Sequence, residues 1–128
     1  MVIEIDFNSQ EAIYIQLRNQ IVMAIASDQL HDGDSLPSVR NLAGAIGVNM
    51  HTVNKAYAML REEGFLKLDR RKGAVVSVEV SSKERELDKI NDYMQMIVAR
   101  AICKEISREE LTDIVNEMYD AITMIDEL

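Results

Sequence analysis

The sequence predicts a mainly α-helical fold with one small β-hairpin, built in two parts. Three successive segments in the first half carry apolar residues at steps of three and four, the spacing of amphipathic helices. A pair of β-branched segments follows them, and two longer helical patterns continue from there. The 128 residues allow one compact domain plus an extension. We place the boundary at the composition shift of Ser81-Ser82, which gives parts of residues 1–80 and 81–128.

Three helices are expected in the first part. The first should run from about residue 10 to residue 27. Pro37-Ser38 can open the second, because proline's fixed φ suits a first helical turn. Gly47 should end it, since helix C-termini often need a positive φ, and Asn49 is a good N-cap for the third. The expected buried stripes are Ile13, Leu17, Ile21, Ala24 and Ile25, then Val39, Leu42, Ala43 and Ile46, then Val53, Ala56, Tyr57 and Leu60.

A β-hairpin is expected next. Residues 65–68 and 74–80 are rich in strand-forming side chains, and the turn between them carries the adjacent cations Arg70, Arg71 and Lys72 before Gly73. The hairpin should therefore have a basic tip. Residues 2–7, at the start of the chain, alternate apolar and polar side chains and can form a short extended arm.

The second part should be a helical hairpin that mediates dimerisation. Ser107-Arg108-Glu109-Glu110 has the capping-box pattern and begins its second helix. Two helices alone cannot bury their apolar stripes without leaving apolar surface, so we expect a homodimer through residues 83–127. The stripe residues are Leu87, Ile90, Met94, Ile97, Ala101 and Ile102, then Leu111, Ile114, Val115, Met118, Ile122 and Ile125.

The charge distribution points to nucleic acid in spite of the total. The net charge is −8, which is unusual for a protein that must neutralise phosphates. Residues 40–75, however, contain seven basic and only three acidic side chains, a local charge of +4. This is a basic patch on an acidic body.

Other classes of protein have little support. No set of serine, cysteine, histidine and acid suggests catalysis, and no glycine-rich phosphate loop is present, so we expect neither an enzyme nor a cofactor. His31 and His51 are far apart and lack ligands at metal spacing. The single cysteine, Cys103, should be a small buried residue. With no signal peptide or membrane span in the pattern, we expect a cytoplasmic protein.

Three helices and a hairpin, with a tight glycine turn between the second and third helices, describe a winged helix-turn-helix. The third helix would read double-stranded DNA, because short or polar side chains at its N-terminal end can reach base edges while cations hold phosphates. The hairpin tip would approach the DNA backbone or the minor groove. The candidate contacts from the third helix and the tip are Asn49, His51, Thr52, Asn54, Lys55, Lys72 and Gly73.

The motifs of this region resemble those of the GntR family of bacterial repressors. They are Leu36-Pro37-Ser38-Val39-Arg40, Leu42-Ala43, Gly47-Val48, Thr52-Val53, Ala56-Tyr57, Leu60 and Glu63-Gly64. With its Lys55-Ala56-Tyr57 run and an extension of under 50 residues, the chain is similar to the YtrA subfamily. The resemblance implies that Arg40 contacts DNA, as do Asn49, His51, Thr52, Lys55 and Gly73. It also implies dimerisation through the extension and control of membrane-transporter genes.

Met50 departs from the family pattern, because an arginine often stands at this position. That arginine would supply a bidentate contact to guanine. We expect two copies to place their third helices in successive major grooves of an inverted repeat and to repress by blocking the promoter. The alternative is a winged helix used only for protein contacts, which would suit the acidic total charge; a small-molecule effector remains open.

Overall fold

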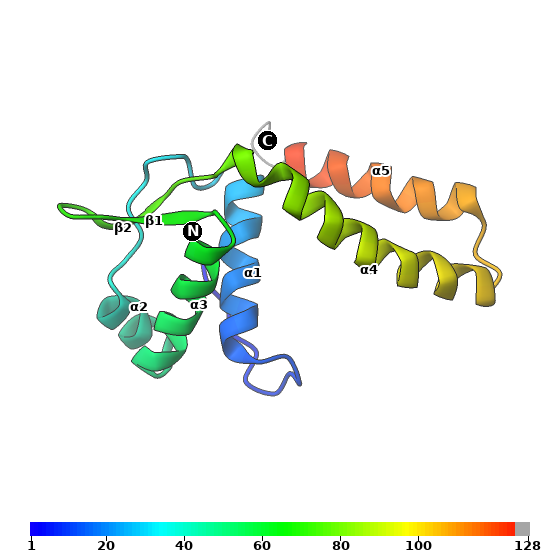
Figure 1. Ribbon diagram of the computed structural model, residues 1–128. Helices are drawn as coiled ribbons and strands as arrows, with labels where there is room; N and C mark the ends of the chain where they lie inside the picture. Colours follow the sequence, from blue (N-terminus) through cyan, green and yellow to red (C-terminus); the bar gives the residue numbers. More distant parts are fainter. Residues whose placement is uncertain (125–128) are drawn as a thin grey trace. The chain divides into compact units, whose positions relative to one another are not determined.

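Figure 1 presents a computed structural model, which describes residues 1–124. The predicted fold class is confirmed: the described residues form five α-helices and one two-stranded antiparallel hairpin. The chain divides into two compact units, residues 1–78 and the residues from 79 on. Ile125, which we placed in the last apolar stripe, lies outside the described residues, as do residues 126–128.

The first unit packs three helices around one core. They are α1 (Ile13–Ala26), α2 (Val39–Ile46) and α3 (Met50–Glu62). Helix α3 packs against both α1 and α2. Most of the predicted stripe residues are buried there: Leu17, Ile21, Ala24, Leu42, Ala43, Val53, Ala56, Tyr57 and Leu60. The remaining four, Ile13, Ile25, Val39 and Ile46, are only half-buried because they lie at the edges of their stripes.

Both ends of α2 and the start of α3 are capped, and the caps at Gly47 and Asn49 are those expected from the sequence. Ser38 is the N-cap of α2, and its hydroxyl oxygen accepts a hydrogen bond from the Asn41 N–H at 3.1 Å. Pro37 therefore precedes the cap and does not occupy the first turn. Gly47 ends α2 with a φ of +73°. Asn49 caps α3, since its Oδ1 accepts from the His51 N–H at 2.8 Å.

The hairpin consists of β1 (Leu66–Asp69) and β2 (Gly73–Val76), with Leu66 opposite Val76 and Asp69 opposite Gly73. The loop before α2 pairs with the free edge of β2: the Gly33 N–H donates to the Val76 carbonyl at 2.8 Å. This pairing fixes the base of the hairpin on the helices.

The predicted extent of the second strand, to residue 80, is wrong. Strand β2 ends at Val76, and Val80–Ser82 forms a 3₁₀ turn instead. The Ser77 N–H still donates to the Phe65 carbonyl at 2.9 Å. The segment that precedes β1, however, turns away at Gly64, where it leads back to α3. Residues beyond 77 therefore have no strand opposite them, and their β-branched composition cannot by itself sustain a ladder.

The N-terminal arm lies along α1. The Asp6 N–H donates to Oε1 of Gln16 at 2.9 Å, and the Glu4 N–H donates to Oε1 of Gln20 at 2.9 Å. The two half-buried residues of the arm, packed on the core, are Ile3 and Ile5.

The second unit contains α4 (Lys83–Cys103) and α5 (Arg108–Met124). Ser107 caps α5 as predicted, accepting from the Glu110 N–H at 3.0 Å. Among residues 79–124 only Ala101 is buried. Cys103 is exposed, so its predicted burial is wrong. Cys103 comes two positions after Ala101, and residues two positions apart on an α-helix are separated by about 200° around its axis. Cys103 therefore points away from the face that buries Ala101.

Gly44 within α2 and Gly47 at its C-terminal end provide a matched test of the turn between α2 and α3. A Cβ at Gly44 or at Gly47 would meet no heavy atom within 4 Å, but only Gly47 has a positive φ. Gly47→Ala should therefore lower the free energy of unfolding by about 1 kcal/mol through backbone strain alone. Gly44→Ala should raise it by about 0.5–1 kcal/mol, because alanine is the better helix former. Chemical denaturation of both variants measures the two signs, and a shared sign would contradict the turn described here.

Candidate nucleic-acid interface

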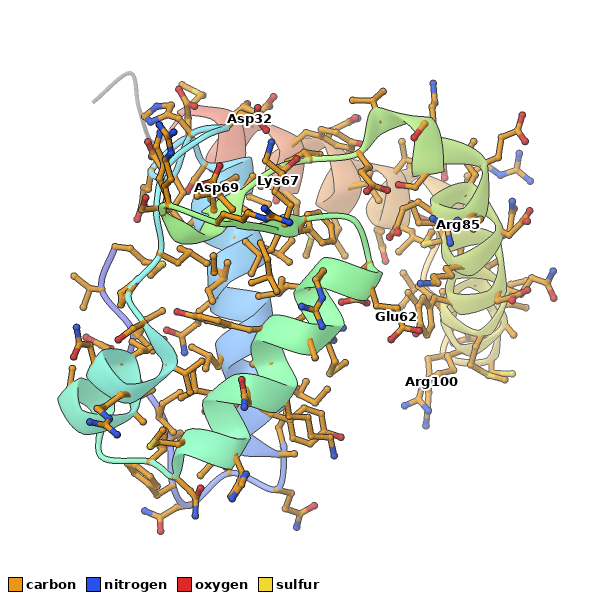
Figure 2. The ribbon with its side chains drawn as sticks, turned by 60° about the vertical axis from the view of Figure 1, so that its left-hand side comes forward. Asp32, Glu62, Lys67, Asp69, Arg85 and Arg100 are labelled. Atoms are coloured by element: carbon orange, nitrogen blue, oxygen red, sulfur yellow. The ribbon has the colours of Figure 1, made fainter. Side chains whose placement is uncertain are left out.

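Helix α3 has one face in the core and one face exposed. The exposed residues recur at helical spacing, so that positions 50, 54, 58 and 61 follow one line along the helix. The exposed residues of this face are Met50, His51, Asn54, Lys55, Ala58 and Arg61. Glu62, labelled in Figure 2, is the one acidic residue of the helix and stands at its C-terminal end.

A groove of about 700 Å³ lies between this face, the start of α2 and the hairpin. Four cationic side chains line it: Lys55 and Arg61 from α3, and Lys67 and Lys72 from the hairpin. None of the described residues that line the groove is acidic. Figure 2 shows Lys67 on β1, near Asp69 at the start of the hairpin turn. The groove therefore presents a concentrated positive charge on a protein whose net charge is −8.

The structure brings together four of the seven DNA-contact residues expected from the sequence. His51 and Lys55 line the groove from α3, and Lys72 and Gly73 line it from the hairpin. Arg40 is exposed on α2 but does not line the groove.

The other two expected residues, Asn49 and Thr52, are partly engaged in holding α3. The side-chain oxygen of Asn49 is occupied as the N-cap of the helix, although the residue as a whole is exposed. Thr52 is half-buried. Neither residue lines the groove.

Two cationic residues of the groove, Arg61 and Lys67, were not among the sequence candidates. Arg61 lies seven residues after Asn54, so helical spacing alone places it on the same face of α3. Lys67 had no comparable signal, because its approach to α3 depends on how the hairpin folds back over the helix.

Tyr57 ties the start of α2 to α3. It is buried, as predicted, and its hydroxyl donates to the Pro37 carbonyl at 2.7 Å. Burial raises the pKa of Tyr57 to about 12, so the hydroxyl remains a donor across the physiological range. The assignment of Tyr57 as plain core missed this bond, which fixes the position of the two helices that flank the groove.

Lys55 is held by an aromatic ring from another helix. Its Nζ lies 4.0 Å from the centroid of the Tyr14 ring, in the first turn of α1. A cation over an aromatic face is attracted by the negative charge density of the ring. Tyr14 therefore restrains the ammonium group at the edge of the groove.

Asp69 orders the hairpin turn and thereby places its cations. Oδ1 of Asp69 accepts hydrogen bonds from the Arg71 N–H at 2.8 Å and the Lys72 N–H at 3.0 Å. These two bonds lower the pKa of the Asp69 carboxyl, and the charges of Lys72 and Lys67 lower it further. Gly73 closes the turn with a φ of +75°, a conformation that glycine adopts at little cost.

No group of three or more His, Cys, Asp or Glu side chains suited to a metal ion occurs within residues 1–124. His31 instead contacts the carboxylates of Asp28 and Asp34, at 3.2 and 3.5 Å. Within the same residues, no helix is long and apolar enough to cross a bilayer.

Residues 11–76 match the family described as bacterial regulatory proteins, gntR family. The HTH-type transcriptional repressor YtrA of Bacillus subtilis (strain 168) is 30% identical over 118 residues, which cover 91% of each chain. This similarity therefore extends through the region of α4 and α5.

Solved structures share the fold. YtrA from Sulfolobus acidocaldarius, a GntR-family transcription factor, is 40% identical with a TM-score of 0.66, over 80% of this chain and 99% of that one. The DNA-binding domain of AraR, solved in complex with operator ORX1, is 24% identical with a TM-score of 0.51, over 59% and 96% of the two chains. The family match and the YtrA relatives confirm the resemblance drawn from the sequence motifs: the chain belongs to the GntR family and is a transcriptional regulator of the helix-turn-helix type.

Proposed function

We propose that this protein is a homodimeric repressor that binds an inverted-repeat operator, with α3 in the major groove of DNA and the hairpin against the adjacent backbone. The observation that carries the proposal is the groove between α3 and the hairpin, which is lined by four cations and, among residues 1–124, by no acidic side chain. Its physical importance lies in the contrast with the rest of the chain. A polypeptide of net charge −8 is repelled by DNA unless its positive charge is concentrated on one face.

The groove residues divide into two roles. His51 and Asn54 lie toward the N-terminal half of α3, where polar side chains can hydrogen-bond to base edges. The four cations Lys55, Arg61, Lys67 and Lys72 neutralise phosphates and set the register of the protein on the duplex. Gly73 allows the hairpin turn to approach the DNA closely, because it carries no side chain.

Three further residues contribute from outside the groove. Arg40, the second residue of α2, is exposed and is assigned to a phosphate or base contact beside the recognition helix. Asn49 lies just before the first turn of α3 and is exposed, and Thr52 lies within that turn. Asn49 therefore combines capping with DNA contact, and Thr52 contributes through the hydroxyl at the edge of the buried face.

A second copy of the chain covers the apolar surface of α4 and α5. Residues 79–124 bury only Ala101, while large apolar side chains of both helices stay exposed. Two helices with this much apolar surface need a partner, and an isologous dimer is the most common solution. Two-fold symmetry of the protein requires an inverted repeat in the operator. The interface falls within residues 83–127, so that residues 1–80 serve as the DNA-binding domain and 81–128 as the dimerisation extension.

The relatives support this assignment. The B. subtilis relative is a transcriptional repressor, and the AraR domain with the same fold is bound to an operator. Control of membrane-transporter genes rests on the likeness to the YtrA subfamily. The competing proposal, a winged helix that contacts only proteins, draws on the acidic total charge and makes opposite predictions for the groove cations.

The first prediction concerns these cations. Duplex DNA is selected from a random library, and the affinity of the wild type, Arg61→Ala and Lys67→Ala is measured across a range of salt concentrations. The slope of log affinity against log salt is negative, and each variant should make it shallower by about 0.9, since one phosphate contact is lost. Lys89→Ala, which removes a charge from α4, is the matched control and should keep the wild-type slope.

Two results would count against DNA binding through the groove. One is a folded wild type that enriches no sequence. The other is an unchanged slope in both groove variants, as the protein-contact alternative requires.

Tyr14 should affect DNA affinity only through Lys55. Tyr14→Leu removes the aromatic face and should weaken binding about two- to fivefold, the factor expected for a cation–π contact of about 0.5–1 kcal/mol. Tyr14→Phe keeps the ring and should bind like the wild type. In a Lys55→Ala background Tyr14→Leu should cause no further loss, and an additive loss in that double variant would argue against the coupling.

The dimer is tested by two substitutions that add the same charge. Met118 lies on the apolar stripe of α5 and is 58% exposed, whereas Asn116 lies on the opposite side of the helix. Met118→Glu should raise the dimer dissociation constant on the order of tenfold or more, because it places an unpaired charge in the interface. Asn116→Glu should leave it unchanged. Sedimentation equilibrium of the intact chain measures both, and a wild type that is monomeric at micromolar concentration would refute the interface.

A further inference from the structure

Met50 is the one apolar residue at the N-terminal end of the exposed face of α3. It is the first residue of the helix, and its side chain is 46% exposed. Asn54 lies four residues later, so both residues belong to the same line along the helix. Asn54 lines the groove, and Met50 lies one turn beyond that lining. The N-terminal end of a recognition helix is the part that reaches base edges. Met50 therefore stands among base-reading residues without a hydrogen-bonding group to read with.

The chemistry of the major groove limits what such a side chain can recognise. Guanine, cytosine and adenine present only hydrogen-bond donors and acceptors there, whereas thymine also presents its C5 methyl group. A methionine side chain is flexible and polarisable and packs well on an apolar surface of irregular shape. Placed against a donor or acceptor, it would remove water from that group without replacing the hydrogen bond, which costs free energy.

We propose that Met50 is a specificity-determining residue that selects thymine in each operator half-site by packing on its C5 methyl group. The proposal rests on the DNA-binding function proposed above and adds to it the base that this residue reads. The polar side chain next to it, His51, lines the groove, and its backbone N–H is bonded to the cap Asn49. The capped first turn holds the backbone at Met50 and thus the position from which its side chain reaches the base.

The test uses deoxyuridine, which lacks only the C5 methyl group and pairs as thymine does. Each thymine of the selected operator is replaced in turn, in both half-sites, and affinity is measured for the intact protein. The wild type should lose about fourfold per half-site at one position, the factor for a buried group of methyl size at about 0.8 kcal/mol. Met50→Ala should bind the thymine and deoxyuridine duplexes with nearly equal affinity at that position.

Two further variants sharpen the experiment. Met23 is 48% exposed and belongs to α1, whereas Met50 begins α3, so Met23→Ala controls for the loss of an exposed methionine and should respond to deoxyuridine as the wild type does. Met50→Arg introduces a bidentate donor and should shift the selected base at the same position from thymine to guanine.

The outcomes separate this inference from the proposed function. If the wild type enriches an operator but Met50→Ala retains the full response to deoxyuridine at every position, the role of Met50 is wrong and the DNA-binding function stands. Selection of guanine or cytosine throughout each half-site would also overturn it. If the folded wild type enriches no sequence at all, the DNA-binding function itself fails, and the role of Met50 fails with it.

Discussion

Helix α3 must pack on the core with one face and form a wall of the groove with the other, and the rest of the first unit depends on that constraint. Its apolar face packs against α1, α2 and β1, while its other face lines the groove. The buried residues of the helix therefore determine the direction in which its exposed residues point. The Tyr57 hydroxyl links this helix to Pro37. Gly47, with its left-handed backbone conformation, makes the short turn that connects α2 to α3. A substitution among the buried residues of α3 would consequently change the direction in which its exposed residues point.

The groove also gathers basic side chains on an acidic protein, as the proposed DNA binding requires. Four cations line the groove, where Tyr14 restrains Lys55 and Asp69 orders the turn that carries Lys72. The carboxylate of Asp69 opposes DNA binding by its charge but supports it by fixing the turn, since its two backbone hydrogen bonds hold the neighbouring cations in place. Acidic side chains outnumber basic ones on α5, and like charge of this kind repels DNA.

Local chemistry made the helical part of this fold predictable. The cap at Asn49, the positive φ of Gly47 and the apolar spacing of α3 are each encoded within a few residues, and the structure confirms them. The end of β2 was predicted too late, because strand length depends on a partner that composition does not reveal. Cys103 was misplaced for a related reason: burial in α4 is decided by which face meets another element.

The site was predictable to the same degree. His51 and Lys55 follow from helical spacing, and Lys72 and Gly73 from the composition of the turn. The meeting of the hairpin with α3 involves residues distant in sequence, so Lys67 emerged only from the fold. The bond from Tyr57 to Pro37 and the contact of Lys55 with Tyr14 likewise join segments that no local pattern connects.

The central claim is that the groove between α3 and the hairpin receives DNA. Amide chemical-shift mapping of the intact, isotope-labelled protein on addition of its selected operator tests this most directly. The account predicts large changes at His51, Asn54 and Gly73, and little change near the Arg18–Glu63 ion pair at the junction of α1 with the end of α3, outside the groove. Changes centred on that ion pair, with the three groove amides unaffected, would contradict it.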